Sequence, residues 1–71
     1  MDRFREMEIF TAVADANSFV RAAERLHVSP PAVTRAVTAL EDRLGVRLFN
    51  RTTRRLSLTE VGMQFLENAR R

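Results

Sequence analysis

The sequence contains no cysteine, and His27 is its single histidine. Without cysteine there are no disulfides, no thiolate chemistry and no cysteine-ligated zinc, and one histidine cannot assemble a histidine-rich metal site. The two glycines, Gly45 and Gly62, are isolated, so no glycine loop of the phosphate-binding kind is present. Glu41 and Asp42 are neighbours that do not face one another on a helix. We therefore predict no catalytic residue, no metal site and no cofactor in this domain, and we do not expect an enzyme.

Long hydrophobic runs are also missing, although hydrophobic residues make up 45% of the 71-residue chain. No run is long enough to cross a bilayer. The N-terminal stretch MDRFREMEIF has neither the apolar core nor the small-residue cleavage site of a signal peptide. A chain of this length forms one domain at most, and it buries only roughly 60% of the surface that its unfolded form exposes. We expect a single cytoplasmic domain with no membrane partner.

Lysine is absent, so all 12 basic residues are arginine. The formal net charge is +3, yet residues 43–59 contain five arginines and no acid. The arginine bias has an ordinary alternative explanation in genome composition, and the basic block has one in a solvated surface loop. Because no acid interrupts the block, the pattern favours a partner that carries phosphates, such as a nucleic acid.

The first part of the chain predicts two helices joined to a third by a tight turn. Apolar residues at helical spacing indicate a first helix over about residues 2–16; they are Met7, Ile9, Phe10, Val13 and Ala14. Ser18 is a suitable N-cap for a second, short helix. The inward face of that second helix consists of Phe19, Ala22, Ala23 and Leu26. We expect His27 to occupy the following turn, in an unusual backbone conformation.

The stretch VSPPAVTRAV, residues 28–37, places two prolines at the start of a helical pattern. A proline follows Ser29 and favours the extended backbone that an N-cap requires. Pro30 and Pro31 then occupy the first two helical positions, where backbone N–H groups have no partner within the helix. Because Pro31 has no donor, the Ser29 hydroxyl can cap only the N–H of Ala32. The two prolines therefore predict a sharply defined helix start.

This third helix is expected to end at Gly45 and to present two different faces. The residues of the predicted buried face are Val33, Val37, Leu40 and Leu44. The residues of the opposite face are Thr34, Arg35 and Thr38 in the first half and Glu41 and Asp42 in the second. A groove lined by phosphates would accept the first half and repel the second. We expect the helix to enter such a groove by its N-terminal end.

The last third of the chain predicts a hairpin and one more helix. In RLFNRTTRRLSL, residues 47–58, two short apolar runs flank a basic tip near 51–55, which indicates two strands. In LTEVGMQFLENARR, residues 58–71, Thr59 is the expected N-cap and Gly62 permits close packing. The apolar stripe of this helix consists of Val61, Phe65, Leu66 and Ala69. Because the pattern is still running at residue 71, we expect the chain to be a fragment of a longer protein.

Two helices joined by a tight turn and followed by a basic hairpin have the layout of a winged helix-turn-helix. The predicted fold class is mainly α, with a three-helix core, a two-stranded β wing and a C-terminal helix. One alternative is a protein-interaction module that dimerises through residues 59–71, with arginines that only make it soluble. Short polar residues on the exposed start of the third helix, beside an arginine-rich hairpin, favour DNA.

Residues 10–62 resemble the N-terminal DNA-binding domain of LysR-type transcriptional regulators. The segments SFVRAAERLHVS, LEDRLGVRLFNRT and LTEVG occur in the order and at the spacing of that family. The resemblance implies a winged helix-turn-helix domain over residues 1–58, with the helix-turn-helix at about 19–38 and the wing at about 47–58. Residues 59–71 would begin the linker and dimerisation helix. The implied protein is a bacterial, cytoplasmic regulator, nucleoid-associated when bound to DNA, whose effector-binding domain, absent from this chain, senses a small-molecule inducer.

The resemblance places Pro30, Pro31, Thr34 and Arg35 against the major groove. Thr34 and Arg35 are our candidates for base readout, since a threonine can bond or pack its methyl group and an arginine can grip guanine with two hydrogen bonds. Arg35 has the alternative role of holding a phosphate. The family usually has glutamine at the position of Pro30, and proline can offer a base only an apolar face. This departure weakens any sequence preference borrowed from the family.

Contacts to the DNA backbone are predicted at the groove edge and at the wing. The candidates at the groove edge are Ser18, Arg21 and Thr38, of which Ser18 has the alternative role of a helix cap and Thr38 that of a plain surface residue. The candidates at the wing, for the backbone and a narrow A·T-rich minor groove, are Arg51, Arg54 and Arg55. At least one wing arginine is expected to be plain surface. The implied partner is double-stranded DNA, an A·T-rich pseudo-palindrome bound by a homodimer or higher oligomer.

Overall fold

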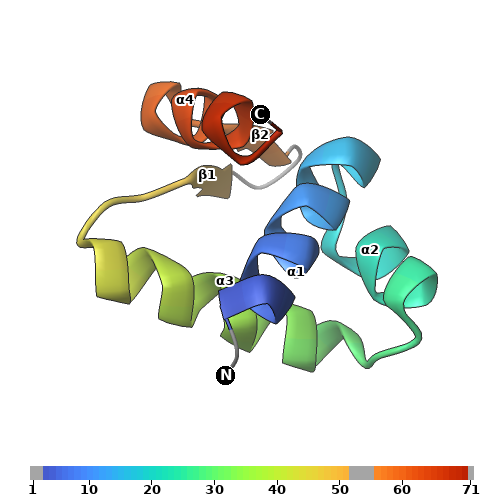
Figure 1. Cartoon of the computed structure of the whole chain (residues 1–71). Coiled ribbons are helices and arrows are strands. Elements are labelled where there is room, and N and C mark those ends of the chain that lie inside the picture. Colours follow the sequence, from blue (N-terminus) through green and yellow to red (C-terminus); the bar gives the residue numbers. More distant parts are fainter. Residues whose placement is uncertain (1–2, 52–55, 71) are drawn as a thin grey trace.

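A computed structural model describes residues 3–51 and 56–70 of the chain, and positions 1–2, 52–55 and 71 lie outside it. Its helices are α1 (Arg3–Ala16), α2 (Phe19–Leu26), α3 (Pro30–Leu44) and α4 (Glu60–Ala69), and its strands are β1 (Phe49–Arg51) and β2 (Leu56–Leu58). The strands pair antiparallel, with Asn50 opposite Ser57. Figure 1 shows α2 and α3 packed around α1, with α4 beside the small sheet. The mainly α fold with a three-helix core, a wing and a C-terminal helix is thus confirmed.

Side-chain caps define where three of these helices begin. The Ser29 side chain is an acceptor for the N–H of Ala32 (3.3 Å), and both prolines occupy the first two positions of α3, as predicted. Ser18 and Thr59 cap α2 and α4 in the same way, each accepting from the N–H three residues later. Since each cap supplies an acceptor to an N–H that has no partner within the helix, these starts are encoded locally.

Left-handed backbone conformations mark where the chain leaves the first three helices. His27 has a φ of 58° in the turn between α2 and α3, and Gly45 has a φ of 72° at the end of α3. Both were predicted from the sequence. Asn17, with a φ of 53°, ends α1 in the same manner. Asparagine tolerates this conformation better than most residues, which explains how α1 and α2 join through so few residues.

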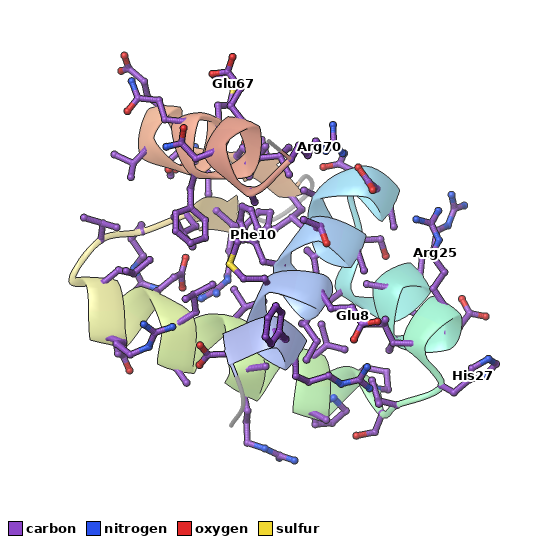
Figure 2. The ribbon with its side chains drawn as sticks, viewed as in Figure 1. Glu8, Phe10, Arg25, His27, Glu67 and Arg70 are labelled. Carbon is purple, nitrogen blue, oxygen red and sulfur yellow. The ribbon has the colours of Figure 1, made fainter. Side chains whose placement is uncertain are left out.

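The core lies where α1, α2, α3 and the base of the sheet meet. Phe10 is fully buried, and its ring centroid lies 5.4 Å from that of Phe49 and 5.2 Å from that of Phe65. Phe19 adds an edge contact to Phe49 at 6.0 Å. Tilted and edge-on ring pairs at these distances add to the stability that the burial of apolar area already provides. Figure 2 shows Phe10 between the elements, whereas His27 and Arg25 extend outward.

The second half of α3 differs from its prediction in two places. Leu44, expected in the core, is 39% exposed, while Glu41, expected on the outer face, is only 3% exposed. The core position beyond the last turn of α3 is filled by Leu48, which is fully buried. The carboxylate of Glu41 points toward the start of the wing, where it accepts the backbone N–H groups of Leu48 and Phe49.

Close packing of α4 against the chain segment before β1 depends on Gly62, which is buried in the first turn of α4. A Cβ atom at this position would collide with the carbonyl oxygen of Leu48, which is backbone and cannot move aside. That same carbonyl accepts the N–H of Thr59 at 2.9 Å, and the Thr59 hydroxyl donates to the carbonyl of Arg47 at 2.7 Å. The predicted close approach at Gly62 is confirmed, and it fixes α4 to the base of the wing.

Candidate nucleic-acid interface

The first turns of α3 form an exposed surface of the kind that the sequence predicted for base contacts. Pro30, Pro31, Thr34 and Arg35 are all exposed, although the helix buries Val33 between them. The two prolines occupy positions whose backbone N–H groups would have no partner within the helix, so they cost α3 no hydrogen bond. The N-terminal end of α3 is therefore anchored by one side and leaves the other side open to a partner.

The two candidates for base readout differ in how they are held. The Thr34 hydroxyl donates to the Pro30 carbonyl at 3.2 Å, which leaves its oxygen as an acceptor. Arg35 forms no ion pair with any carboxylate in residues 3–51 and 56–70. Its guanidinium keeps all its donors available, and a planar fork of N–H groups matches the two acceptors of guanine or the oxygens of a phosphate.

The candidates for phosphate contacts at the groove edge lie on α2 and α3. Ser18 is half-buried and its side chain accepts the N–H of Arg21 at 3.1 Å, so the capping role is confirmed. The Ser18 oxygen accepts this bond, and the hydroxyl hydrogen can still be donated to a phosphate oxygen. The Arg21 side chain is exposed, and Thr38 is half-buried. The structure brings all three to positions that solvent reaches, and their contacts to DNA stay predictions.

The wing is described at its base only, so Arg54 and Arg55 lie outside the described residues. Arg51, the third wing candidate, is held in place from two sides. Its Nη2 atom lies 2.7 Å from Oε1 of Glu41, and its guanidinium carbon lies 5.4 Å from the centroid of the Phe19 ring. Only 30% of the Arg51 side chain is exposed. An ion pair and a cation–π contact together restrict the positions from which this arginine can reach DNA.

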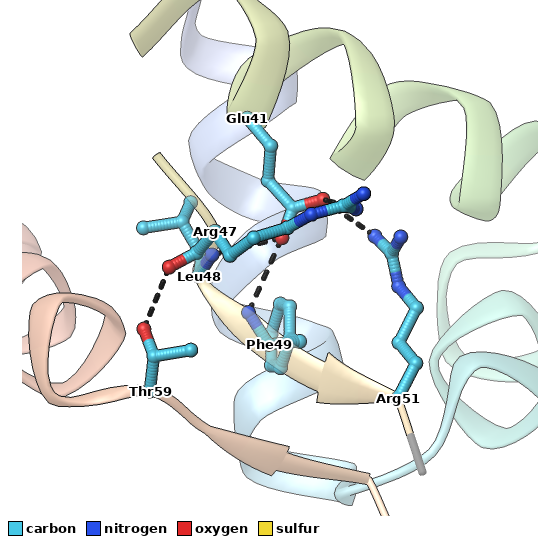
Figure 3. A network of polar contacts seen from close by, with 6 residues as sticks. All are labelled: Glu41, Arg47, Leu48, Phe49, Arg51 and Thr59. Atoms are coloured by element: carbon cyan, nitrogen blue, oxygen red, sulfur yellow. Dashed lines mark hydrogen bonds and ion pairs between the residues drawn. The ribbon is translucent and has the colours of Figure 1, made fainter. Parts of the chain in front are cut away.

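The Glu41 carboxylate is buried and uses both of its oxygens (Figure 3). Oε2 accepts the backbone N–H of Leu48 at 2.8 Å and that of Phe49 at 3.2 Å. Oε1 lies 2.7 Å from the Arg51 guanidinium and 3.5 Å from that of Arg47, whose side chain is 71% exposed. A buried carboxylate is tolerated only when its acceptors are satisfied, and here three hydrogen bonds and a longer ion pair to Arg47 satisfy it.

A second buried glutamate compensates a further arginine of the basic block. Glu6 of α1 is 7% exposed and pairs with Nη2 of Arg43, on the last turn of α3. The three described arginines of residues 43–59, namely Arg43, Arg47 and Arg51, thus each face a carboxylate. The block contains no acid of its own, but in the fold its described arginines have counter-charges from outside it. The acids come from other segments, which the fold brings close.

These elements and their order match known proteins. Residues 4–63 match the family described as bacterial regulatory helix-turn-helix proteins, lysR family. The chain belongs to the LysR family. The regulator ClcR of Pseudomonas putida is 52% identical over 68 residues, which cover 96% of this chain and 23% of ClcR. The regulator CrgA of Neisseria meningitidis is 52% identical over 66 residues, which cover 93% of this chain and 22% of CrgA. The chain therefore spans less than a quarter of these relatives.

Solved structures of LysR-family members share the fold. The DNA-binding domain of CbnR in complex with DNA superposes with a TM-score of 0.90 at 50% identity, covering 99% of this chain and 79% of that one. The DNA-binding domain of BenM with benA site 1 DNA gives a TM-score of 0.91 at 33% identity, covering 97% of this chain and 76% of that one. The fold is the winged helix-turn-helix of the LysR family, and the relatives named here are transcriptional regulators, not enzymes.

In this LysR-family domain, the stripe predicted for dimerisation on α4 is divided between two environments. Phe65 and Leu66 pack against the core of their own domain, and Ala69 is half-buried. Val61 is 44% exposed, and Met63, which the stripe did not include, is 54% exposed. The apolar surface of α4 that remains open therefore includes Val61 and Met63, because Phe65 is committed to its contact with Phe10.

The sequence patterns did not single out Glu6, Arg43 or Arg47 for these ion pairs, and they placed Glu41 on the outer face of α3. A signal for both glutamates was nevertheless present. Glu41 lies four residues after Val37, and Glu6 lies four residues before Phe10, so each shares the inward face of its helix. An acid on an apolar helix face, in a chain with an unusually basic segment elsewhere, indicates a buried ion pair.

Two further kinds of site were sought in the described part of the chain, a metal centre and a membrane span. Within it there is no group of three or more His, Cys, Asp and Glu residues placed to hold a metal ion. Among its helices, none is long and apolar enough to cross a membrane.

Proposed function

We propose that this domain binds double-stranded DNA with the N-terminal end of α3 in the major groove. The observation that carries the proposal is the exposed start of α3, where Thr34 and Arg35 stand beside two prolines and Arg35 has no carboxylate partner among the described residues. A free guanidinium on a helix of this type can grip the O6 and N7 atoms of guanine. The related domains of CbnR and BenM were solved as complexes with DNA, which supports the same activity here.

The remaining candidates fit the sugar–phosphate backbone. Ser18, Arg21 and Thr38 are proposed for the phosphates at the groove edge, where they would fix the register of the helix without reading bases. At the wing, Arg54 and Arg55 are proposed for the backbone and a narrow A·T-rich minor groove. Arg51 is proposed for the same region, with a smaller direct share because Glu41 already holds it.

For the whole regulator we propose the arrangement that its relatives suggest. Full-length CbnR was solved with its target DNA, and this chain covers 24% of it. We infer a homodimer or higher oligomer on an A·T-rich pseudo-palindrome, with exposed apolar side chains of α4, such as Val61 and Met63, contributing to the dimer contact. An effector-binding domain absent from this chain would take a small-molecule inducer. The location would be the bacterial cytoplasm, on the nucleoid when DNA is bound.

The first experiment is a selection of bound duplexes from a random DNA library at physiological salt. Enrichment of an interrupted palindrome with A·T-rich flanks would confirm a dimeric, sequence-specific regulator. Enrichment of single half-sites would confirm DNA reading by a monomeric domain. If nothing is enriched, the selection is repeated with a dimerising helix fused after residue 71, and a second failure contradicts specific recognition.

A salt series separates DNA binding from the rival function, a protein-interaction module with solubilising arginines. Binding through several phosphates releases counterions, so the logarithm of affinity falls by ~0.9 per phosphate for each tenfold rise in salt. An apolar contact between helices would respond little to the same change. An affinity for duplexes that stays flat between about 50 and 200 mM salt would overturn the proposal.

A further inference from the structure

The Glu41 carboxylate is the polar link between the recognition helix and the wing. Among the described residues, every hydrogen bond and ion pair between α3 and residues 47–51 ends on it. The other hydrogen bonds of this segment pair β1 with β2 and join residues 47 and 48 to Thr59, at the start of α4. Figure 3 shows how Glu41 reaches down from its helix to the strand, with Arg51 approaching from the other side.

The position of Glu41 suits a link between two DNA-binding parts. It lies six residues after Arg35 on the same rigid helix, about 9 Å along the axis at 1.5 Å per residue. A pair of three-residue strands has little stability of its own, so the sheet depends on what it packs against. Arg51 extends the link to α2, because its guanidinium lies over the ring of Phe19.

We propose that Glu41 is a positioning residue for DNA binding: it fixes the wing relative to α3, so that the wing meets the backbone while the start of α3 occupies the groove. The proposal rests on the proposed function. Two surfaces that bind one rigid duplex at the same time must be held at a set separation, because each loses its contacts when the other is displaced. Glu41 itself need not touch DNA.

The direction in which Glu41→Gln changes DNA affinity distinguishes a positioning role from a simple effect of charge. Glu41→Gln removes a negative charge and raises the net charge of the domain, so a pure charge effect would tighten binding to DNA. The positioning role predicts the opposite. Glutamine retains one carbonyl oxygen for the N–H groups of Leu48 and Phe49, but it attracts the guanidinium of Arg51 far less. Released from this anchor, the wing should lose backbone contacts.

The matched control is Glu6→Gln, which also neutralises a buried glutamate paired with an arginine but lies on α1, away from the wing. Both variants are compared with the wild-type chain on one selected duplex, between about 50 and 200 mM salt. Thermal unfolding first establishes a temperature at which each is folded. For Glu41→Gln we expect an affinity about tenfold lower and a salt slope reduced by about one phosphate or more. For Glu6→Gln we expect the wild-type slope.

Equal or tighter binding by Glu41→Gln, with an unchanged slope, would overturn the proposal. If that variant does not fold, Arg51→Lys decides instead, because it keeps the charge and leaves Glu41 bonded to two backbone N–H groups. Lysine lacks the planar fork that pairs with Glu41 and stacks on Phe19, so we expect an affinity about threefold lower and a smaller slope. Wild-type affinity in Arg51→Lys contradicts positioning. If the wild-type chain itself shows no salt-dependent binding, the proposed function fails first and takes this inference with it.

Discussion

The two ends of α3 hold arginines in opposite environments. Arg35, near the N-terminal end, is exposed and has no carboxylate partner among the described residues, whereas Arg43, on the last turn, is paired with the buried Glu6. Between them, Glu41 holds two more arginines from residues 47–51. One helix thus leaves a guanidinium exposed at one end and pairs guanidinium groups with buried carboxylates at the other.

The distribution of charge along the chain suggests that the arginines of residues 43–59 are unpaired, and the structure shows the opposite for the described ones. Residues 43–59 contain no acid, yet each of their described arginines faces a carboxylate. Residues 18–38 include Glu24, yet Arg21 and Arg35 are exposed and take part in no ion pair within the described ranges. The net charge of a sequence segment therefore does not show which of its arginines are free of ion pairs in the folded domain.

The largest loss of stability is expected from removing the Glu41 carboxylate, near the C-terminal end of α3. Glu41→Ala leaves two backbone N–H groups and the Arg51 guanidinium without their acceptor, and breaking a buried pair in this way typically costs 3–5 kcal/mol. Urea denaturation measures the loss. The control is Glu8→Ala, because Glu8 pairs with Arg5 on the surface of α1 and should change stability by less than ~0.5 kcal/mol. Equal losses for the two variants would mean that the buried network does not stabilise the fold.

The second-largest loss of stability is expected where Gly62 of α4 packs against the backbone of Leu48. In Gly62→Ala the new methyl group meets the carbonyl oxygen of Leu48, so we expect a loss of ~3 kcal/mol, at the upper end for overpacking. Gly45→Ala is the control with a different mechanism, since its Cβ would meet nothing within 4 Å but the backbone has a φ of 72°. That strain is worth about 1–2 kcal/mol. A thermal-unfolding series in which Gly45→Ala is the worse variant would contradict the close contact.

Substitutions of the two arginines of α3 should have different effects: one should lower stability and the other should lower DNA affinity. Arg43→Ala leaves the buried Glu6 without its partner, and we expect a stability loss of about 1–3 kcal/mol, with little change in affinity for a selected duplex. Arg35→Ala should leave stability within ~0.5 kcal/mol and weaken binding by about 1–3 kcal/mol, mostly at one base pair. If both variants lose affinity equally on a panel of single-base changes, the division between the two ends of α3 does not hold.

The smallest effect belongs to an exposed ion pair between Asp15 at the end of α1 and Arg70 after α4. Both side chains are about half exposed, so solvent and salt screen the pair. Asp15→Asn should lower stability by ~0.2–1 kcal/mol at low salt and by less at high salt. Thermal unfolding at two salt concentrations checks this, and a loss as large as that of Arg43→Ala would contradict the distinction between buried and exposed pairs.

Much of the candidate site could be predicted from the sequence. The predicted exposure is confirmed for Pro30, Pro31, Thr34 and Arg35. Helical periodicity groups Thr34 and Arg35 with Pro31, and groups Val33 with the buried Val37, because residues three and four positions apart share a face. The same rule, applied to Glu41, conflicted with the expectation that a charge lies outside. There the periodicity was correct, and the chemistry of the residue was misleading.

The sequence by itself determined the ends of the elements in this protein. The caps at Ser29 and Thr59, the prolines after Ser29 and the left-handed turns at His27 and Gly45 all join atoms within five residues, so no distant segment is needed to form them. The tertiary structure decided which arginines remain free for a partner. Glu6 and Arg43 are 37 residues apart, and only the packing of α1 against α3 brings the carboxylate to the guanidinium.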